Sequence, residues 1–334
     1  MENRGGVIME RKICSLVGAV SFLLCTPGLA AAAVPTSVVA FNPAAGELPE
    51  AITTDAVGNI YASMGAKIKK ITPSGVVSVF ATLPLPSGVL SAGLKFGDDN
   101  HLYVASGSLS PVPPVAFVFR IDMSGHVEVY AALDPTGFPN DIAFNDEGEL
   151  FVTDPLLGQI WKIDADGNPD VWLADPAFDG NEDDPYLVLS RFGVDGIAFD
   201  KYKNRLYVGN LDYGKILRVG IDCHGEPGDV EVWVDDFASL AGADGIAFDD
   251  NGSLFVAVNG QDSLVQIDKY RHVNTIAEGG LLDAPSSLVF GATYQSRKTL
   301  YIASFAITRA FGIFPGTPQP ALLKLPVAYK GLPL

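Results

Sequence analysis

Cysteine, histidine and basic residues are scarce in this chain of 334 residues, which has 3 Cys and 4 His, and 22 Lys and Arg against 39 Asp and Glu. Cys14 and Cys25 fall in an N-terminal segment that we expect to be removed, so only Cys223 remains. No intramolecular disulfide can then form, and a folded core must hold the structure together. The formal net charge of −17 argues against nucleic acid and anionic membranes as partners.

Several chemical signatures are also missing. The chain has no Gly-x-Ser-x-Gly motif, no P-loop and no Gly-x-Gly-x-x-Gly motif after a first strand. The histidines fall in or beside predicted turns, which argues against a zinc or iron site; they are His101, His126, His224 and His272. If the protein is an enzyme, a bound hard cation is therefore the expected source of its chemistry.

The N-terminus has the pattern of a secretory signal. The basic pair Arg11 and Lys12 precedes an apolar stretch at 13–24, and small residues follow at 26–33. We expect residues 1–33 to be a signal peptide, which predicts a secreted or periplasmic protein with no membrane contact after cleavage. An uncleaved anchor is the alternative, although the apolar stretch is short for a membrane span.

The remaining chain contains a short motif that recurs six times. Its centre is an Ile-Ala-Phe sequence, followed by an Asp/Asn/Gly turn and a second strand of the Leu-Phe-Val type. The copies are centred on Ile52, Leu94, Ile142, Ile197, Ile246 and Leu288. A period of roughly 40 to 55 residues with several short strands per unit is typical of propeller blades. Residues 34–334 are therefore predicted to form one all-β domain, a six-bladed β-propeller.

The last blade is predicted to be completed by the beginning of the domain. After the strand predicted at 321–325 the chain soon ends, which leaves blade six without a fourth strand. Residues 37–41 form a strand that no blade uses. We predict that this N-terminal strand completes blade six, because closure removes the exposed sheet edges that an open ring would leave.

One position in the motif carries oxygen side chains. Two residues before each central aliphatic residue stand Glu50, Ala92, Asn140, Asp195, Asp244 and Ser286. Four of these six have a carboxylate or amide oxygen, and equivalent positions on inner strands surround one axis. We therefore expect four oxygen groups to converge at one mouth of the channel. The alternative is that Asn-Asp and Asp-Gly are turn residues without a common role.

Convergence of these groups would create a site for a hard cation. Glu50, Asp195 and Asp244 would repel one another, and their pKa values would rise unless a cation were bound. Calcium accepts six to eight oxygen ligands in flexible geometry, which suits ligands from four strands, with Asn140 as the fourth. The predicted cofactor is one divalent metal, with Ca²⁺ preferred.

Three longer segments interrupt the repeat at 107–117, 174–192 and 305–320. In an antiparallel blade such segments emerge on the face where the inner strands begin, so we expect them around the cation site. Phe305 and Phe311 could form part of an apolar lid, although the segment could instead pack on its own blade. The predicted substrate-binding residues are Asp141, Ser286, Phe305 and Phe311.

The pattern resembles the senescence-marker-protein/gluconolactonase/luciferin-regenerating-enzyme family of six-bladed propellers. The residues that carry the resemblance are Pro49-Glu50, Pro139-Asn140-Asp141, Asp195-Gly196, 243–248, 287–291 and 298–302. The resemblance implies one catalytic divalent metal, commonly calcium, bound at the positions of Glu50, Asn140, Asp195 and Asp244. It also implies that Asp244 is the catalytic base or nucleophile. Asp195 stands where the family usually has Asn, which should tighten metal binding and weaken Lewis acidity.

Three functions are compatible with these features. The favoured one is a metal-dependent hydrolase that acts on lactones or related esters as small-molecule substrates. The alternatives are a non-catalytic binding propeller of the NHL type and a propeller enzyme that resembles strictosidine synthase and needs no metal. No pattern in the sequence indicates an oligomeric state.

Overall fold

The computed structural model describes residues 34–109, 114–187 and 191–332. The predicted signal peptide, residues 1–33, lies outside the described residues. Within these ranges, no helix combines the length and the apolar composition that are needed to cross a membrane.

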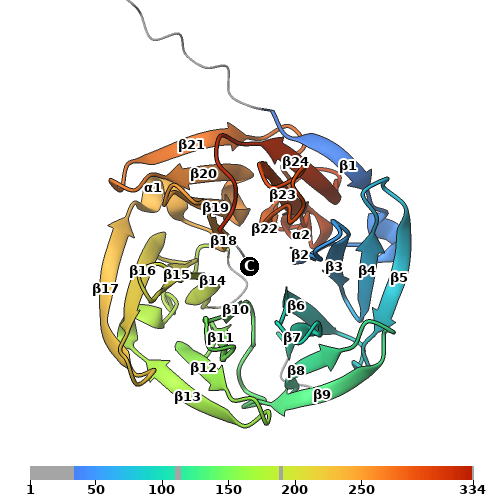
Figure 1. The fold of residues 1–334 in the computed structure, drawn as a ribbon. Helices are drawn as coiled ribbons and strands as arrows, with labels where there is room; N and C mark the ends of the chain where they lie inside the picture. The colour runs from blue at the N-terminus through green and yellow to red at the C-terminus, as the bar shows by residue number, and fades with distance from the viewer. Residues whose placement is uncertain (1–33, 110–113, 188–190, 333–334) are drawn as a thin grey trace, which may run out of the picture. The chain divides into compact units, whose positions relative to one another are not determined.

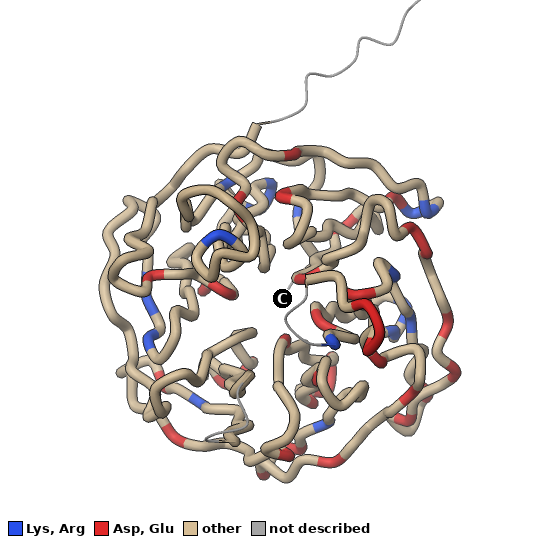
Figure 2. Tube along the Cα trace, turned by 180° about the vertical axis from the view of Figure 1, so that it is seen from behind, with Lys and Arg blue, Asp and Glu red and all other residues tan. Residues whose placement is uncertain are grey.

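The described residues form six four-stranded antiparallel sheets around a central axis (Figure 1). This arrangement confirms the predicted all-β six-bladed propeller. Figure 2 shows the propeller from the opposite side, with more acidic than basic residues along the chain.

The strands of the first three blades follow the predicted order from the axis outward. Blade one contains β2 (Ile52–Thr54), β3 (Ile60–Met64), β4 (Lys67–Ile71) and β5 (Val77–Thr82). Blade two contains β6 (Val89–Phe96), β7 (Leu102–Ser108), β8 (Ala116–Ile121) and β9 (Val127–Ala132). Blade three contains β10 (Ile142–Phe144), β11 (Leu150–Asp154), β12 (Gln159–Ile163) and β13 (Pro169–Ala174).

The other three blades have the same plan, except that blade six takes its outer strand from the start of the domain. Blade four contains β14 (Val194–Asp200), β15 (Arg205–Asn210), β16 (Lys215–Ile221) and β17 (Pro227–Asp235). Blade five contains β18 (Ala243–Phe248), β19 (Leu254–Val258), β20 (Ser263–Ile267) and β21 (Val273–Glu278). Blade six contains β22 (Pro285–Phe290), β23 (Thr299–Ser304), β24 (Ala321–Pro326) and β1 (Thr36–Ala40).

Helices are confined to short segments between strands. They are η1 (Pro43–Ala45), η2 (Pro176–Phe178), α1 (Phe237–Leu240), η3 (Asn259–Gln261) and α2 (Ile307–Ala310).

The ring is closed by β1, as the sequence predicts. β1 pairs with β24 in antiparallel register, from Thr36 opposite Lys324 to Ala40 opposite Ala321. A hydrophobic cluster that includes Phe41 joins blade six to blade one. The two ends of the domain are therefore joined by backbone hydrogen bonds within blade six, core packing joins blade six to blade one, and β24 has no free edge.

The core lies between the blades. Each of the six hydrophobic clusters in the described residues combines side chains from two neighbouring blades. Between blades one and two, for example, the ring of Tyr61 makes edge contacts with Phe80 and Phe96 at centroid distances of 4.9 and 5.1 Å. Such edge-to-face packing is the favoured arrangement of aromatic rings. The contact with Phe96 packs β3 of blade one against β6, the inner strand of blade two.

Candidate active site at one mouth of the channel

The four predicted oxygen residues lie together at one mouth of the channel. Glu50, Asn140, Asp195 and Asp244, called here the oxygen ring, all line one cleft of about 70 Å³. The convergence expected from the repeat is therefore observed. Their role as ligands of a cation remains a prediction.

Bulges in two inner strands lie beside residues of the oxygen ring. In blade four the pairing register shifts between Val194 and Ile197, and in blade five between Ala243 and Ile246. Each shift is a bulge next to a ring residue, and bulges commonly redirect side chains beside functional sites. Asp195 and Asp244 thus belong to strands rather than to the turns that were the alternative reading of Asp-Gly.

The glycines that follow the ring residues allow the inner strands to approach closely. A Cβ atom on Gly196 would lie 2.1 Å from the main-chain oxygen of Asp244. A Cβ on Gly245 would lie 2.6 Å from the main-chain oxygen of Ser286. Neither distance is sterically possible, so the Asp-Gly pairs reflect contact between neighbouring blades.

The carboxylates of the ring are electrostatically unfavourable as they stand. Burial, the largest cause, raises the pKa of Glu50, Asp195 and Asp244 well above its usual value. The negative charge of Asp195 raises the pKa of Glu50 and Asp244 further. Asp141 adds to this effect on all three groups. A bound cation would relieve this repulsion.

Several oxygen atoms at the site have no hydrogen-bond partner. Glu50 Oε2, Asp195 Oδ1 and Asn259 Oδ1 are buried and unpaired. Because buried polar atoms normally have partners, these three oxygens fit a bound cation that would provide one. These donor atoms are all oxygens, which are the ligands that calcium prefers. The described ranges contain no group of three or more His, Cys, Asp or Glu side chains with the spacing of a metal cluster, so water or amide ligands would have to complete the coordination.

Asn259 is a site residue that the sequence analysis missed. It follows β19, and its Nδ2 donates a hydrogen bond to Asp244 Oδ2 at 3.1 Å. Asn259 does not occupy the repeated position on the inner strands that identifies the oxygen ring. A polar residue at the end of a second strand, beside the start of the inner strand, is the signal that could have found it.

Two of the predicted substrate-binding residues take part in contacts between blades. The carboxylate of Asp141 accepts hydrogen bonds from the main-chain N–H of Ile142 at 2.8 Å and of Ile197 at 3.1 Å. The hydroxyl of Ser286 donates to the main-chain oxygen of Glu50. Neither residue is among those that line the cleft. The observed role of Asp141 and Ser286 is to form these contacts. Binding of substrate by either residue remains a prediction.

The other two, Phe305 and Phe311, line the cleft. The longer segments reach it as expected, through Leu109 from the first, Leu187 and Phe192 from the second, and Phe305 and Phe311 from the third. Their placement confirms that the extra segments surround the oxygen ring.

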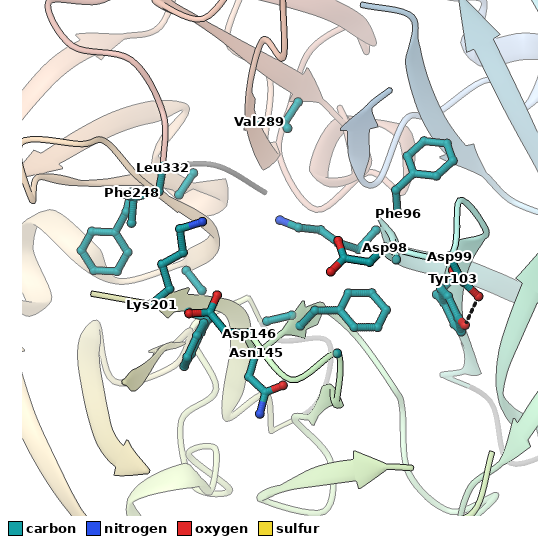
Figure 3. Close-up of a pocket in the computed structure, with 18 of the residues that line it drawn as sticks. Phe96, Asp98, Asp99, Tyr103, Asn145, Asp146, Lys201, Phe248, Val289 and Leu332 are labelled. Atoms are coloured by element: carbon teal, nitrogen blue, oxygen red, sulfur yellow. Dashed lines mark hydrogen bonds between the residues drawn. The ribbon is translucent and has the colours of Figure 1, made fainter. Parts of the chain in front are cut away.

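A larger cavity lies at the opposite mouth of the channel, and no sequence pattern predicted it. Its volume is about 490 Å³, and it is lined by residues from the far ends of the inner strands (Figure 3). Lys201, Asp98 and Asp146 are among its charged lining residues. Size alone does not make it the reaction site, because the oxygen ring lies at the other mouth.

Fold and site together define a six-bladed propeller with buried carboxylates at one channel mouth. Residues 193–306 match the family model described as the SMP-30/Gluconolactonase/LRE-like region. The chain is 29% identical over 219 residues to a gluconolactonase of Zymomonas mobilis, and the match spans 58% of each protein. These similarities confirm the resemblance that the sequence motifs predict.

Solved structures support the same fold. A luciferin-regenerating enzyme has a TM-score of 0.63 and 14% identity, with 89% of this chain and 97% of that chain covered. The calcium-binding protein regucalcin from Agrobacterium tumefaciens has a TM-score of 0.62 and 18% identity, with 90% and 97% covered. At these identities the likeness shows the fold alone.

Proposed function

We propose that this protein is a hydrolase of lactones or related esters that depends on a divalent cation, with calcium as the ion best suited to its oxygen donors. The observation that carries the proposal is the set of buried, unpaired carboxylate oxygens on the floor of a cleft. The similarity to a gluconolactonase supports the reaction class. The signal-like N-terminus further supports action outside the cytoplasm, on a small-molecule substrate.

The oxygen ring provides the residues that would hold the cation: Glu50, Asn140, Asp195 and Asp244. When bound, such an ion supplies Lewis acidity that polarises a carbonyl oxygen and stabilises the developing negative charge. Three carboxylates give the site a high negative charge, which favours calcium binding.

Asp244 is the residue best placed to move a proton. Its Oδ2 accepts the hydrogen bond from Asn259, which fixes the carboxylate and leaves Oδ1 to accept a proton from an attacking water. Burial and the neighbouring carboxylates raise the pKa of Asp244. This direction strengthens a carboxylate as a base, and a bound cation would moderate it.

The test measures turnover of a panel of lactones and esters by the mature protein with calcium and after chelation. Asp244→Asn should lower turnover by about 10² or more, the usual contribution of a positioned base. The matched control is Asp98→Asn, which makes the same chemical change at the far cavity and should retain activity. Full activity of the chelated protein or of Asp244→Asn would overturn the proposal. A folded protein that binds calcium without turnover would instead be a binding propeller.

A further inference from the structure

The walls of the cleft differ in character from its floor. Of the fifteen described residues that line it, nine are Leu, Ile or Phe. The other six are the four residues of the oxygen ring together with Asp212 and Asn259. The described lining contains no Lys, Arg, Ser, Thr or Tyr, so the polar side chains available to the hydroxyls of a sugar are confined to these six residues.

The two polar residues outside the oxygen ring already have partners. The carboxylate of Asp212 accepts hydrogen bonds from the main-chain N–H of Asn181 at 2.9 Å, Tyr186 at 3.0 Å and Phe192 at 2.8 Å. It therefore holds the long segment between blades three and four in place. Asn259 donates to Asp244. A polyhydroxylated ligand would leave hydroxyl groups unpaired against apolar walls, which is unfavourable.

The wall formed by blade six is anchored firmly. Arg309, in α2, donates through Nη2 to Asp262 at 2.7 Å and through Nη1 to Asp283 at 2.6 Å. These bonds fix the short helix that carries Ile307 and precedes Phe311. Ala306 has a positive φ of 60°, a strained conformation that persists only where surrounding contacts enforce it.

Part of this wall is apolar surface that folding does not bury. Phe311 is 58% exposed although it lines the cleft. The exposed ring of Phe311 is continuous with the Leu, Ile and Phe side chains that line the cleft, and contiguous apolar surface of this kind commonly marks a ligand site.

We propose that the substrates are lactones or esters that carry an aliphatic or aromatic substituent, rather than polyhydroxylated sugar lactones. This inference rests on the proposed function. The ester carbonyl lies over the oxygen ring, and the substituent packs against Phe305, Ile307 and Phe311. Water adds to the carbonyl carbon and the ester C–O bond breaks; the proton taken up by Asp244 passes to the leaving oxygen, which gives a hydroxy acid or an acid and an alcohol.

The test compares lactones that share one ring size. Calcium-loaded mature protein is assayed with δ-valerolactone, δ-octalactone, δ-decalactone and glucono-δ-lactone. The value of kcat/KM should rise about fourfold for each methylene that becomes buried, which corresponds to about 0.8 kcal/mol. Glucono-δ-lactone should be the poorest substrate of the four.

Two variants locate the effect. Phe311→Ser should lower kcat/KM for δ-decalactone about tenfold or more, and should lower it by a larger factor than for δ-valerolactone, so that the dependence on chain length becomes weaker. The matched control is Tyr294→Ser, an aromatic residue that is 76% exposed in the turn between β22 and β23 of the same blade, on the opposite face. It should behave like the wild type.

Arg309→Gln tests the anchoring of the wall. It should raise KM for δ-decalactone more than it lowers kcat, and Arg309→Lys should restore part of the difference. A preference for glucono-δ-lactone, or an unchanged chain-length dependence in Phe311→Ser, would overturn this inference alone. Absence of turnover with every lactone and ester would overturn the proposed function and this inference with it.

Discussion

Replacement of Asp244 by Asn should change stability in opposite directions with and without calcium. Without a cation, the variant removes one of three buried negative charges that raise one another's pKa values. The amide oxygen of Asn can still accept the hydrogen bond from Asn259. At pH 8 and in chelator, the variant should therefore be more stable than the wild type.

Charge repulsion and calcium binding change the free energy of unfolding in opposite directions. Loss of the repulsion should stabilise the cation-free variant, because burial and the neighbouring carboxylates raise the pKa values of all three groups. Calcium at 100 times its Kd should stabilise the wild type by about 2.7 kcal/mol. With about 300 ordered residues and an unfolding entropy of about 2.1 cal/mol/K per residue, this corresponds to about 4 °C in Tm.

The assay is thermal unfolding of both proteins in chelator and in calcium. The variant should melt above the wild type in chelator and below it in calcium. A variant that is destabilised equally in both conditions would refute the reasoning. That outcome would mean that Asp244 stabilises the fold through local contacts rather than through a charged cation site.

Three further predictions concern pH, the neighbour of Asp244 and ring closure. In chelator, wild-type Tm should fall as pH rises from 5 to 8. Acids whose folded-state pKa is raised destabilise the protein once pH exceeds their unfolded pKa, and the loss of stability is complete above the folded pKa. A flat pH profile of Tm, with no difference from the calcium-bound protein, would contradict this. Asn259→Leu should lower kcat by about 10-fold or more, because a hydrogen bond to a charged group contributes about 1.5–3 kcal/mol. The measurement is steady-state kinetics, and an unchanged kcat would contradict this prediction. A chain that starts at Phe41, and so lacks β1, should self-associate through the exposed edge of β24 in light scattering, whereas a chain that starts at Thr36 should remain as the wild type.

The fold could be predicted because its determinants are local and repeated. In the sequence of each blade, strand patterns alternate with turn residues. The closing strand, Thr36–Ala40, followed from counting: one blade lacked an outer strand and one strand lacked a blade. The boundaries of the inner strands were less accessible, because Asp195-Gly196 has the composition of a turn. Only the close approach of the neighbouring strand shows why Gly is required there.

The oxygen ring could be predicted because the symmetry of the propeller converts one sequence position into one place in space. Asn259 and the cavity of the far mouth could not be found in this way. Asn259 belongs to no repeated register, and its importance depends on its contact with Asp244. The volume of the far cavity depends on how widely the inner strands are spaced, which no single residue encodes.

Two blades carry no carboxylate or amide at the position of the oxygen ring. Ala92 of blade two has no oxygen, and the hydroxyl of Ser286 in blade six is used by the main chain of Glu50. These two blades flank blade one, and they contribute apolar lining residues such as Leu90 and Phe311. The acidic lining residues come from blades one, four and five, whereas the apolar lining residues come from blades two, four and six and from the links that precede blades three and four. A ligand with a polar carbonyl over the oxygen ring and an apolar tail against these walls matches this lining.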